Sequence, residues 1–220
     1  MFFFPIGCLI FSLFILFLPI LFILGFFHIV TIGFEKLGVS PEVTIFLLLA
    51  ILIGSSINIP LTRQKLVRVE EPIFFGLFRA PRIKTQAIAI NLGGAVIPIL
   101  LSFYFLFLSW RAGFELQPVL IAIILMIIIC KFLARIIPGI GISLPFFIPP
   151  IFSAIFALIL APDFAAPCAF ISGVLGTLIG ADILNLPKAQ KYGGFISIGG
   201  AGVFDGIFLV GIVSALLAGF

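Results

Sequence analysis

Long apolar runs separated by short polar segments make up most of the chain. About 20 apolar residues cross the hydrocarbon core of a bilayer as an α-helix, and continuous runs disfavour a β-barrel, whose strands alternate. The pattern therefore predicts an all-α polytopic membrane protein, with about seven transmembrane helices in one integral membrane domain of residues 1–220. The expected spans are 2–27, 43–60, 86–108, 118–137, 149–160, 167–186 and 199–220.

Two segments interrupt this pattern. The longest polar stretch, Thr62 to Thr85, mixes alternating and apolar residues, and either a β-strand or a segment at the membrane interface would suit it. The segment from Pro138 to Pro150 contains four prolines. These exclude a regular helix throughout it, because proline lacks the amide N–H that a helix needs.

The composition agrees with the membrane class. Hydrophobic residues make up 63% of the chain, charged residues only 9%, and the mean hydropathy is +1.45. A soluble globular domain has about 25% charged residues. We therefore expect the bilayer, and not a large aqueous core, to cover most of the apolar surface.

Lysine and arginine are concentrated in alternate loops. The loops after the second, fourth and sixth expected spans hold 10 of the 12. Because cytoplasmic loops are enriched in these residues, the distribution predicts a multi-pass plasma-membrane protein with a cytoplasmic N-terminus and a C-terminus on the outer side. It also explains the net charge of +4 without a nucleic-acid partner.

Cysteine and histidine give no sign of a metal or redox site. Cys8, Cys130 and Cys168 lie scattered through apolar stretches, and His28 ends the first expected span without a partner. This spacing matches neither a disulfide framework nor a set of metal ligands. We expect no metal and no cofactor.

The last two expected spans each carry one aspartate near the turn that joins them. Asp182 lies six residues before Lys188, and Asp205 lies six residues after Gly199. At 1.5 Å per residue, both are expected about 9 Å from the cytoplasmic interface. An acidic side chain in a membrane helix is costly and usually functional, so two at matched depth suggest a working pair.

Two carboxyls in contact cannot both ionise, so such a pair supplies one base and one acid. The base would activate a water molecule and the acid would protonate a carbonyl or an amine, as in aspartic proteolysis. The simpler interpretation of Asp205 is that it only stabilises a helix N-terminus, where the dipole favours an anion. Asp182 lies near a helix C-terminus and lacks that explanation.

Glycines are frequent in the turn before the second aspartate. Gly199, Gly200 and Gly202 would let the backbone of an extended peptide approach closely, and the peptide could add a strand beside the FISI segment, 195–198. Packing between helices is the alternative role for these glycines.

The two aspartate motifs resemble those of presenilins and signal peptide peptidases, the GxGD-type intramembrane aspartyl proteases. In that class one catalytic Asp lies in a Tyr-Asp motif on the sixth helix and the other in a Gly-x-Gly-Asp motif on the seventh. The corresponding segments here are ADILNL with Asp182 and GAGVFDGIFLVG with Asp205. The resemblance implies a presenilin-like helix pair over residues 167–220 and a catalytic role for both aspartates.

The run SIGGAGVFDGIF, Ser197 to Phe208, also resembles a prokaryotic family of membrane proteins of unknown function, domain-of-unknown-function family 1614. That resemblance is expected to cover the whole chain, whereas the protease resemblance covers only the C-terminal helix pair.

The chain departs from the protease pattern at three places. Ala181 replaces the tyrosine, and Val203 and Phe204 separate the Gly-Ala-Gly from its aspartate. The Pro-Ala-Leu motif of the ninth presenilin helix has no counterpart after Asp205. The candidates to replace it are Asn58, Pro60 and Pro145.

These observations favour an intramembrane aspartyl protease that cuts a membrane-embedded peptide near the cytoplasmic face. The expected partners are membrane lipid and a transmembrane peptide substrate. One alternative is a proton- or ion-coupled transporter or channel that uses the same carboxylates. Another is a non-catalytic assembly or lipid-binding protein, in which both aspartates would be dispensable.

Overall fold

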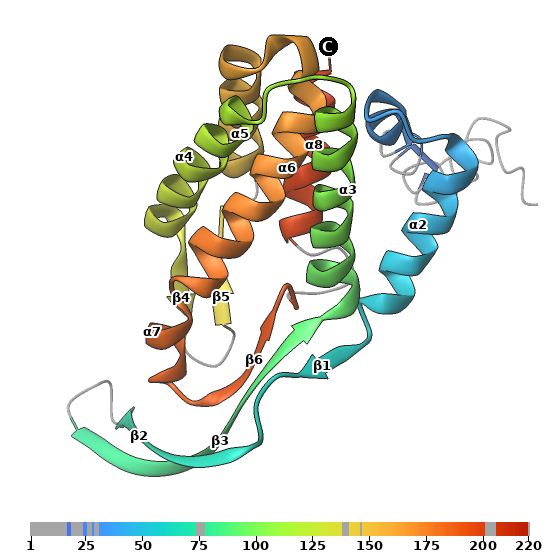
Figure 1. The fold of residues 1–220 in the computed structure, drawn as a ribbon. Helices are drawn as coiled ribbons and strands as arrows, with labels where there is room; N and C mark the ends of the chain where they lie inside the picture. Colours follow the sequence, from blue (N-terminus) through green and yellow to red (C-terminus); the bar gives the residue numbers. More distant parts are fainter. Residues whose placement is uncertain are drawn as a thin grey trace, which may run out of the picture.

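The computed structural model places helix α6 (Ala165–Thr177) at the centre of a helical bundle (Figure 1). Around it pack α3 (Ile97–Arg111), α4 (Gln117–Leu133), α5 (Ile148–Leu160) and α8 (Gly206–Ala218). Eleven of the thirteen residues of α6 are buried, so this helix contributes little surface to lipid or water. The structure describes residues 17–18, 24–25, 28, 31–73, 78–137, 141–145, 147–200 and 206–219.

Small residues let α6 approach its neighbours closely. A Cβ on Gly176 would collide with the Met126 side chain of α4, and one on Gly180, in the η3 segment that continues α6, would collide with the carbonyl oxygen of Ile127. Spacing of small residues by four positions is typical of helix contacts in membranes, where close backbone approach replaces the hydrophobic driving force. The sequence GTLIG therefore accounts for the α4–α6 contact.

Buried serines add hydrogen bonds between α6 and two other helices, α5 and α8. Ser153 of α5 and Ser214 of α8 both donate to the carbonyl oxygen of Ala169 in α6, over 2.8 and 3.0 Å. The hydroxyl of Ser172 lies 2.9 Å from that of Ser153. Because each hydroxyl has a partner, these residues hold the helices together without leaving a polar group unsatisfied.

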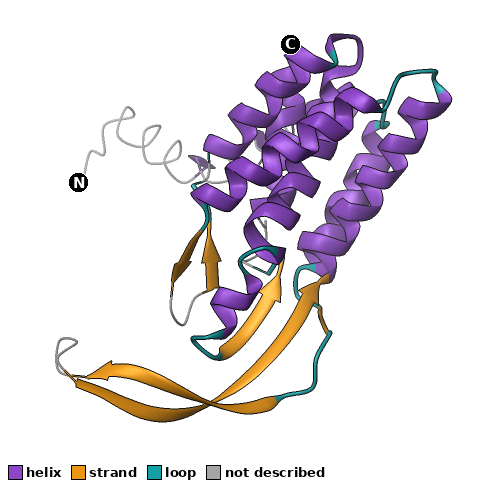
Figure 2. Cartoon of the chain, turned by 60° about the vertical axis from the view of Figure 1, so that its left-hand side comes forward, coloured by secondary structure: helices purple, strands orange, loops and turns teal. Residues whose placement is uncertain are grey.

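A four-stranded sheet covers the end of the bundle that lies away from the C-terminal end of α8 (Figures 1 and 2). Its longest strand, β3 (Phe78–Asn91), pairs antiparallel with β2 (Lys65–Ile73) and β1 (Asn58–Pro60) along successive parts of its length. On its other edge β3 pairs in parallel with β6 (Gly194–Ile198). A short hairpin of β4 (Arg135–Ile137) and β5 (Gly141–Ser143) follows α4 at the same end.

Shorter elements connect these units. Helix α2 (Pro41–Gly54) meets the π-helix η1 (Leu92–Val96), where a Cβ on Gly93 would collide with the carbonyl oxygen of Ile51. The turn η2 (Pro162–Phe164) precedes α6, and the π-helix η3 (Leu178–Ile183) continues it towards α7 (Leu186–Gln190).

The prediction of a mostly helical chain is confirmed, and the prediction of an all-α fold is wrong. The expected third span begins at Leu92, because residues 86–91 belong to β3. The centre of this stretch, AIAI, consists of apolar residues that also suit a membrane helix, yet β1 and β6 satisfy its backbone hydrogen bonds from either side. Local apolar content cannot distinguish a short helical segment from a buried strand of this kind.

The number of spans is only partly supported. Two continuous helices, Leu92–Arg111 and Pro162–Gln190, are long and apolar enough to cross a membrane. The helices α2, α4, α5 and α8 are apolar but shorter. The second, fourth and seventh expected spans extend beyond α2, α4 and α8, whereas the fifth agrees with α5 to within a residue. The first, 2–27, lies almost entirely outside the described residues.

Candidate functional site

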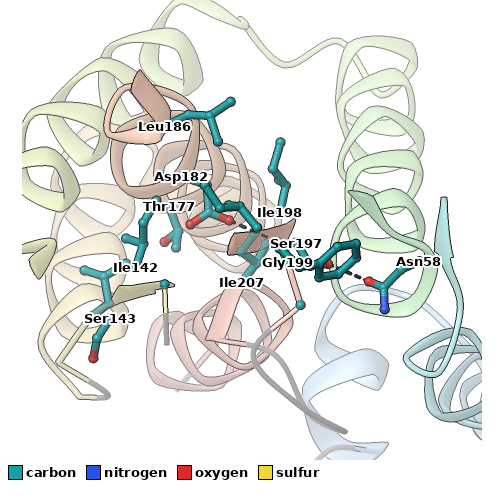
Figure 3. A pocket seen from close by; sticks show the side chains of 15 residues that line it. Asn58, Ile142, Ser143, Thr177, Asp182, Leu186, Ser197, Ile198, Gly199 and Ile207 are labelled. Carbon is teal, nitrogen blue, oxygen red and sulfur yellow. Dashed lines mark hydrogen bonds between the residues drawn. The ribbon is translucent and has the colours of Figure 1, made fainter. Parts of the chain in front are cut away.

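A cavity of about 430 Å³ lies at the sheet end of the bundle, between β5 and β6 (Figure 3). Ile142 and Ser143 of β5 line one side of it, and residues 195–198 of β6 line the other. Thr177, the last residue of α6, and Asp182, near the end of η3, complete the lining. Asp182 is the only ionisable side chain among the described residues that line this cavity.

Asp182 reaches the cavity from a π-helical turn. The amide of Leu184 donates to the carbonyl of Ile179, five residues earlier, and this widened turn replaces the regular α-helical bond. Asn185, which is buried, donates to the carbonyl oxygens of Gly180 and Ala181 over 3.1 and 3.0 Å. Single π-helical turns occur often at functional sites, because the added residue redirects one side chain.

The carboxylate of Asp182 also joins η3 to the end of β6. Its Oδ2 atom accepts a hydrogen bond from the backbone N–H of Gly199 over 3.1 Å. Gly199 has φ +67°, a conformation that residues with a side chain rarely adopt. A Cβ there would also lie 2.6 Å from the Cβ of Ala95, so glycine is required at this position for two independent reasons.

A hydrogen-bond network of polar side chains supports the β6 wall. Ser197 of β6 donates to Oδ1 of Asn58 in β1 over 2.5 Å (Figure 3). The same oxygen accepts a bond from Asn91 over 3.2 Å. Asn91 is 2% exposed, donates to the carbonyl of Ser55 and accepts from the N–H of Gly94, both over 2.7 Å. The network ties the cavity wall to the start of η1.

A second polar side chain lies near the carboxylate. Thr177, which is buried, places its hydroxyl 3.6 Å from the sulfur of Cys130. Cys130 and Cys168 are both buried and form no disulfide. Among the residues that the structure describes, no three His, Cys, Asp or Glu side chains lie together as a metal site would require.

The predicted site residues are distributed as follows. Asp182, Gly199 and Gly200 line the cavity, whereas Gly202 and Asp205 lie outside the described residues. A Cβ on Gly200 would collide with the hydroxyl of Ser197. Packing within the chain therefore accounts for glycine at both Gly199 and Gly200. The close approach of a substrate backbone to these glycines stays a prediction.

The three candidates for the missing proline motif differ in position. Asn58 lines the cavity and takes part in the polar network. Pro60 pairs with Ala89 in the sheet and is not among the lining residues. Pro145 follows Leu144, which does line the cavity.

Three further residues were missed by the sequence reasoning. Thr177, Asn185 and Ser197 lie beside the cavity or hold its walls, and each is a single small polar residue in an apolar or turn segment. Such residues are common in membrane helices, so composition alone does not single them out. Their contacts in the folded chain, and not their residue types, identify them as part of the site.

Comparison with known proteins identifies one family. The model of DUF1614, described as a protein of unknown function, matches residues 52–217. Neither the curated proteins nor the solved structures include a match to this chain. The match covers the sheet, the helical bundle and Asp182, and on this basis the chain belongs to the DUF1614 family.

Proposed function

We propose that this chain is an intramembrane aspartyl protease whose Asp182 and Asp205 together hydrolyse a membrane-embedded peptide. The observation that carries the proposal is the placement of one carboxylate, Asp182, in a cavity bounded by two strands. Gly200 and Ile207, which lie on either side of the segment containing Asp205, line the same cavity. These two flanking residues support the proposal that Asp205 acts at the same cavity as Asp182.

The chemistry follows from a carboxylate and a carboxylic acid in one site. The carboxylate removes a proton from water, which attacks the peptide carbonyl while the acid protonates the carbonyl oxygen. The carboxyl that took the water proton then protonates the amine as the C–N bond breaks, and the other carboxylate takes back the hydroxyl proton, so the pair returns to one acid and one base. Thr177 adds a hydroxyl to the lining beside Asp182. Neither a metal nor a cofactor is required for these steps.

The wall formed by β6 supports a peptide substrate in particular. One edge of β6 pairs with β3, and within the described part of the chain no strand pairs with its other edge. Residues 195–198 line the cavity. An extended peptide can pair with such an edge, which would hold a scissile bond in the open conformation that hydrolysis requires.

The proposed orientation has the sheet end of the bundle in the cytoplasm and the C-terminal end of α8 on the outer side. It is supported by the positions of these two features at opposite ends of the bundle (Figure 2). The resemblance to presenilins, in which the catalytic pair lies nearer the cytoplasmic side, agrees with it.

The test is binding of a hydroxyl-bearing peptide isostere to the purified chain in detergent. Transition-state mimics bind far more tightly than substrates, so the natural substrate need not be known. We expect binding to be lost in Asp182→Asn and in Asp205→Asn. Asp163→Asn is the matched control, because Asp163 lies in η2 at the other end of α6 and is exposed.

Binding that survives both site substitutions would refute the proposal. Failure of the unmodified, folded chain to bind any such isostere would refute it as well. If Asp182→Asn and Asp205→Asn instead abolished proton or cation flux into liposomes, the two carboxylates would belong to a transport pathway. Carboxylates beside interrupted membrane helices have that function in transporters.

A further inference from the structure

The β2–β3 hairpin extends away from the helical bundle. Figures 1 and 2 show it below the bundle and running across the helix axes, in two views turned about the vertical. If the helices cross a membrane, the hairpin therefore runs along the membrane plane. Its function is not explained by the cavity, because none of the described residues of 62–85 lines it.

The charge of the chain is concentrated in this hairpin. Residues 62–85 contain six of the twelve Lys and Arg residues and two of the eight Asp and Glu residues. The segment thus carries a net charge of +4, the same as the whole chain, and the remaining residues are neutral on balance. The basic residues are Arg63, Lys65, Arg68, Arg79, Arg82 and Lys84.

Exposed apolar side chains accompany the cations. Leu66 is 76% exposed and Ile83 is 69% exposed. The strand register pairs Leu66 with Thr85 and Arg68 with Ile83, which places Leu66 and Ile83 on one face of the hairpin. Val69 belongs to the other face, is 6% exposed and lies close to Gly193. The register places Arg68 and Arg79 on the face of Leu66 and Ile83, and Lys65, Arg82 and Lys84 on the face of Val69, so basic positions occupy both faces of the hairpin.

The backbone sets the depth of the hairpin. Within the described residues β2 pairs only with β3, so the amides and carbonyls of its outer edge need water or polar headgroups. Such an edge cannot lie in hydrocarbon. At its other end β3 leads directly into the apolar helix Leu92–Arg111, which can span the membrane. The base of the hairpin accordingly lies at the boundary between hydrocarbon and water.

We propose that the described residues of the hairpin, 62–73 and 78–85, form a binding surface for the anionic phospholipid headgroups of the leaflet at the sheet end of the bundle. A basic segment beside a membrane helix is attracted to an anionic leaflet, and exposed apolar side chains between the cations add contact with the acyl boundary. The inference rests on the membrane location of the chain and not on its protease chemistry.

The test is hydrogen–deuterium exchange of the full chain in nanodiscs. One set contains zwitterionic phosphatidylcholine alone, and the other contains one third phosphatidylglycerol. Amides of residues 62–73 are expected to exchange more slowly in the anionic discs, whereas those of α6 exchange equally in both. The difference should shrink in 1 M salt, where the Debye length falls to about 3 Å.

The variant Arg63→Gln/Lys65→Gln removes two exposed cations from the hairpin. It should reduce the ratio of exchange rates between the two discs by roughly fivefold for each cation removed. The matched control is Lys188→Gln/Lys191→Gln, which removes two exposed cations at the same end of the bundle but outside the hairpin. It should leave the hairpin protected.

Equal exchange in the two kinds of disc would overturn the proposal, and so would an equal effect of both double variants. Protection by added duplex RNA, with no difference between the discs, would assign the surface to nucleic acid and also overturn it. Isostere binding does not depend on this surface, so the two proposals fail independently.

Discussion

Replacing Gly199 by alanine tests whether the end of β6 is held against η1 as tightly as the structure indicates. The new Cβ would lie 2.6 Å from the Cβ of Ala95 and 2.8 Å from its backbone nitrogen. The residue would also have to keep φ +67°. The substitution therefore combines a backbone cost with a steric one.

The two contributions can be separated in magnitude. A residue with a side chain in the left-handed region costs about 1–2 kcal/mol. Forcing an extra carbon into a packed contact costs about 1–3 kcal/mol. We expect Gly199→Ala to lower the free energy of unfolding by about 2–5 kcal/mol. Gly194→Ala, with φ +101° and open space around the new Cβ, should show only the backbone part.

The assay is unfolding of the purified chain in mixed micelles with increasing SDS, followed by circular dichroism. Isostere binding measured on the same samples should weaken in Gly199→Ala, because the N–H of Gly199 is the donor to Asp182. Adding Ala95→Gly to Gly199→Ala should restore part of the lost stability. The reasoning fails if Gly199→Ala costs no more than Gly194→Ala, or if Ala95→Gly restores nothing.

Three further predictions follow from other contacts. Asn91→Ala leaves several buried polar partners unsatisfied and should lower the free energy of unfolding by about 2–4 kcal/mol in the same SDS assay. Asn58→Ala, at an exposed residue, should lower it clearly less. Equal losses would contradict the role of burial. Gly176→Ala adds a Cβ against Met126 and should lower the free energy of unfolding by about 1–3 kcal/mol. An unchanged unfolding midpoint would show that α4 and α6 can move apart to make room for the methyl group. A phosphatase fused after Phe220 should be active outside the cell and one inserted at Gln64 inactive, and the reverse result would invert the proposed topology.

The parts of the fold that depend on local sequence were predictable. The Pro-rich stretch before α5 is not helical in its described part, as its prolines require, and α5 begins where the prolines Pro149 and Pro150 can occupy the first turn. Asp182 was singled out by its charge in an apolar helix, and among the described lining residues it is the ionisable one.

The remaining features depend on partners that are distant in the sequence. Residues 86–91 form a strand because β6 pairs with them, more than a hundred residues later. Asn91 looks like an isolated polar residue until Ser55 and Gly94 are brought to it. The π-helical turn at Asp182 likewise depends on Asn185 supplying bonds to two carbonyls, which no periodicity in the apolar pattern reveals.

The parallel pairing of β6 with β3 has a consequence for how the protein is made. The bond between Ser197 and Asn58 joins residues 139 positions apart, so the β6 side of the cavity can close only after nearly all of the described chain has been synthesised. Contacts at such separation carry a large loop-closure entropy and form late in folding. In the proposed membrane location, the helices would insert into the bilayer one after another while the cavity still lacks a wall. In this order, Asp182 cannot contact a peptide bound along β6 during biosynthesis. Any activity of the site would begin only after residues 194–200 have left the ribosome.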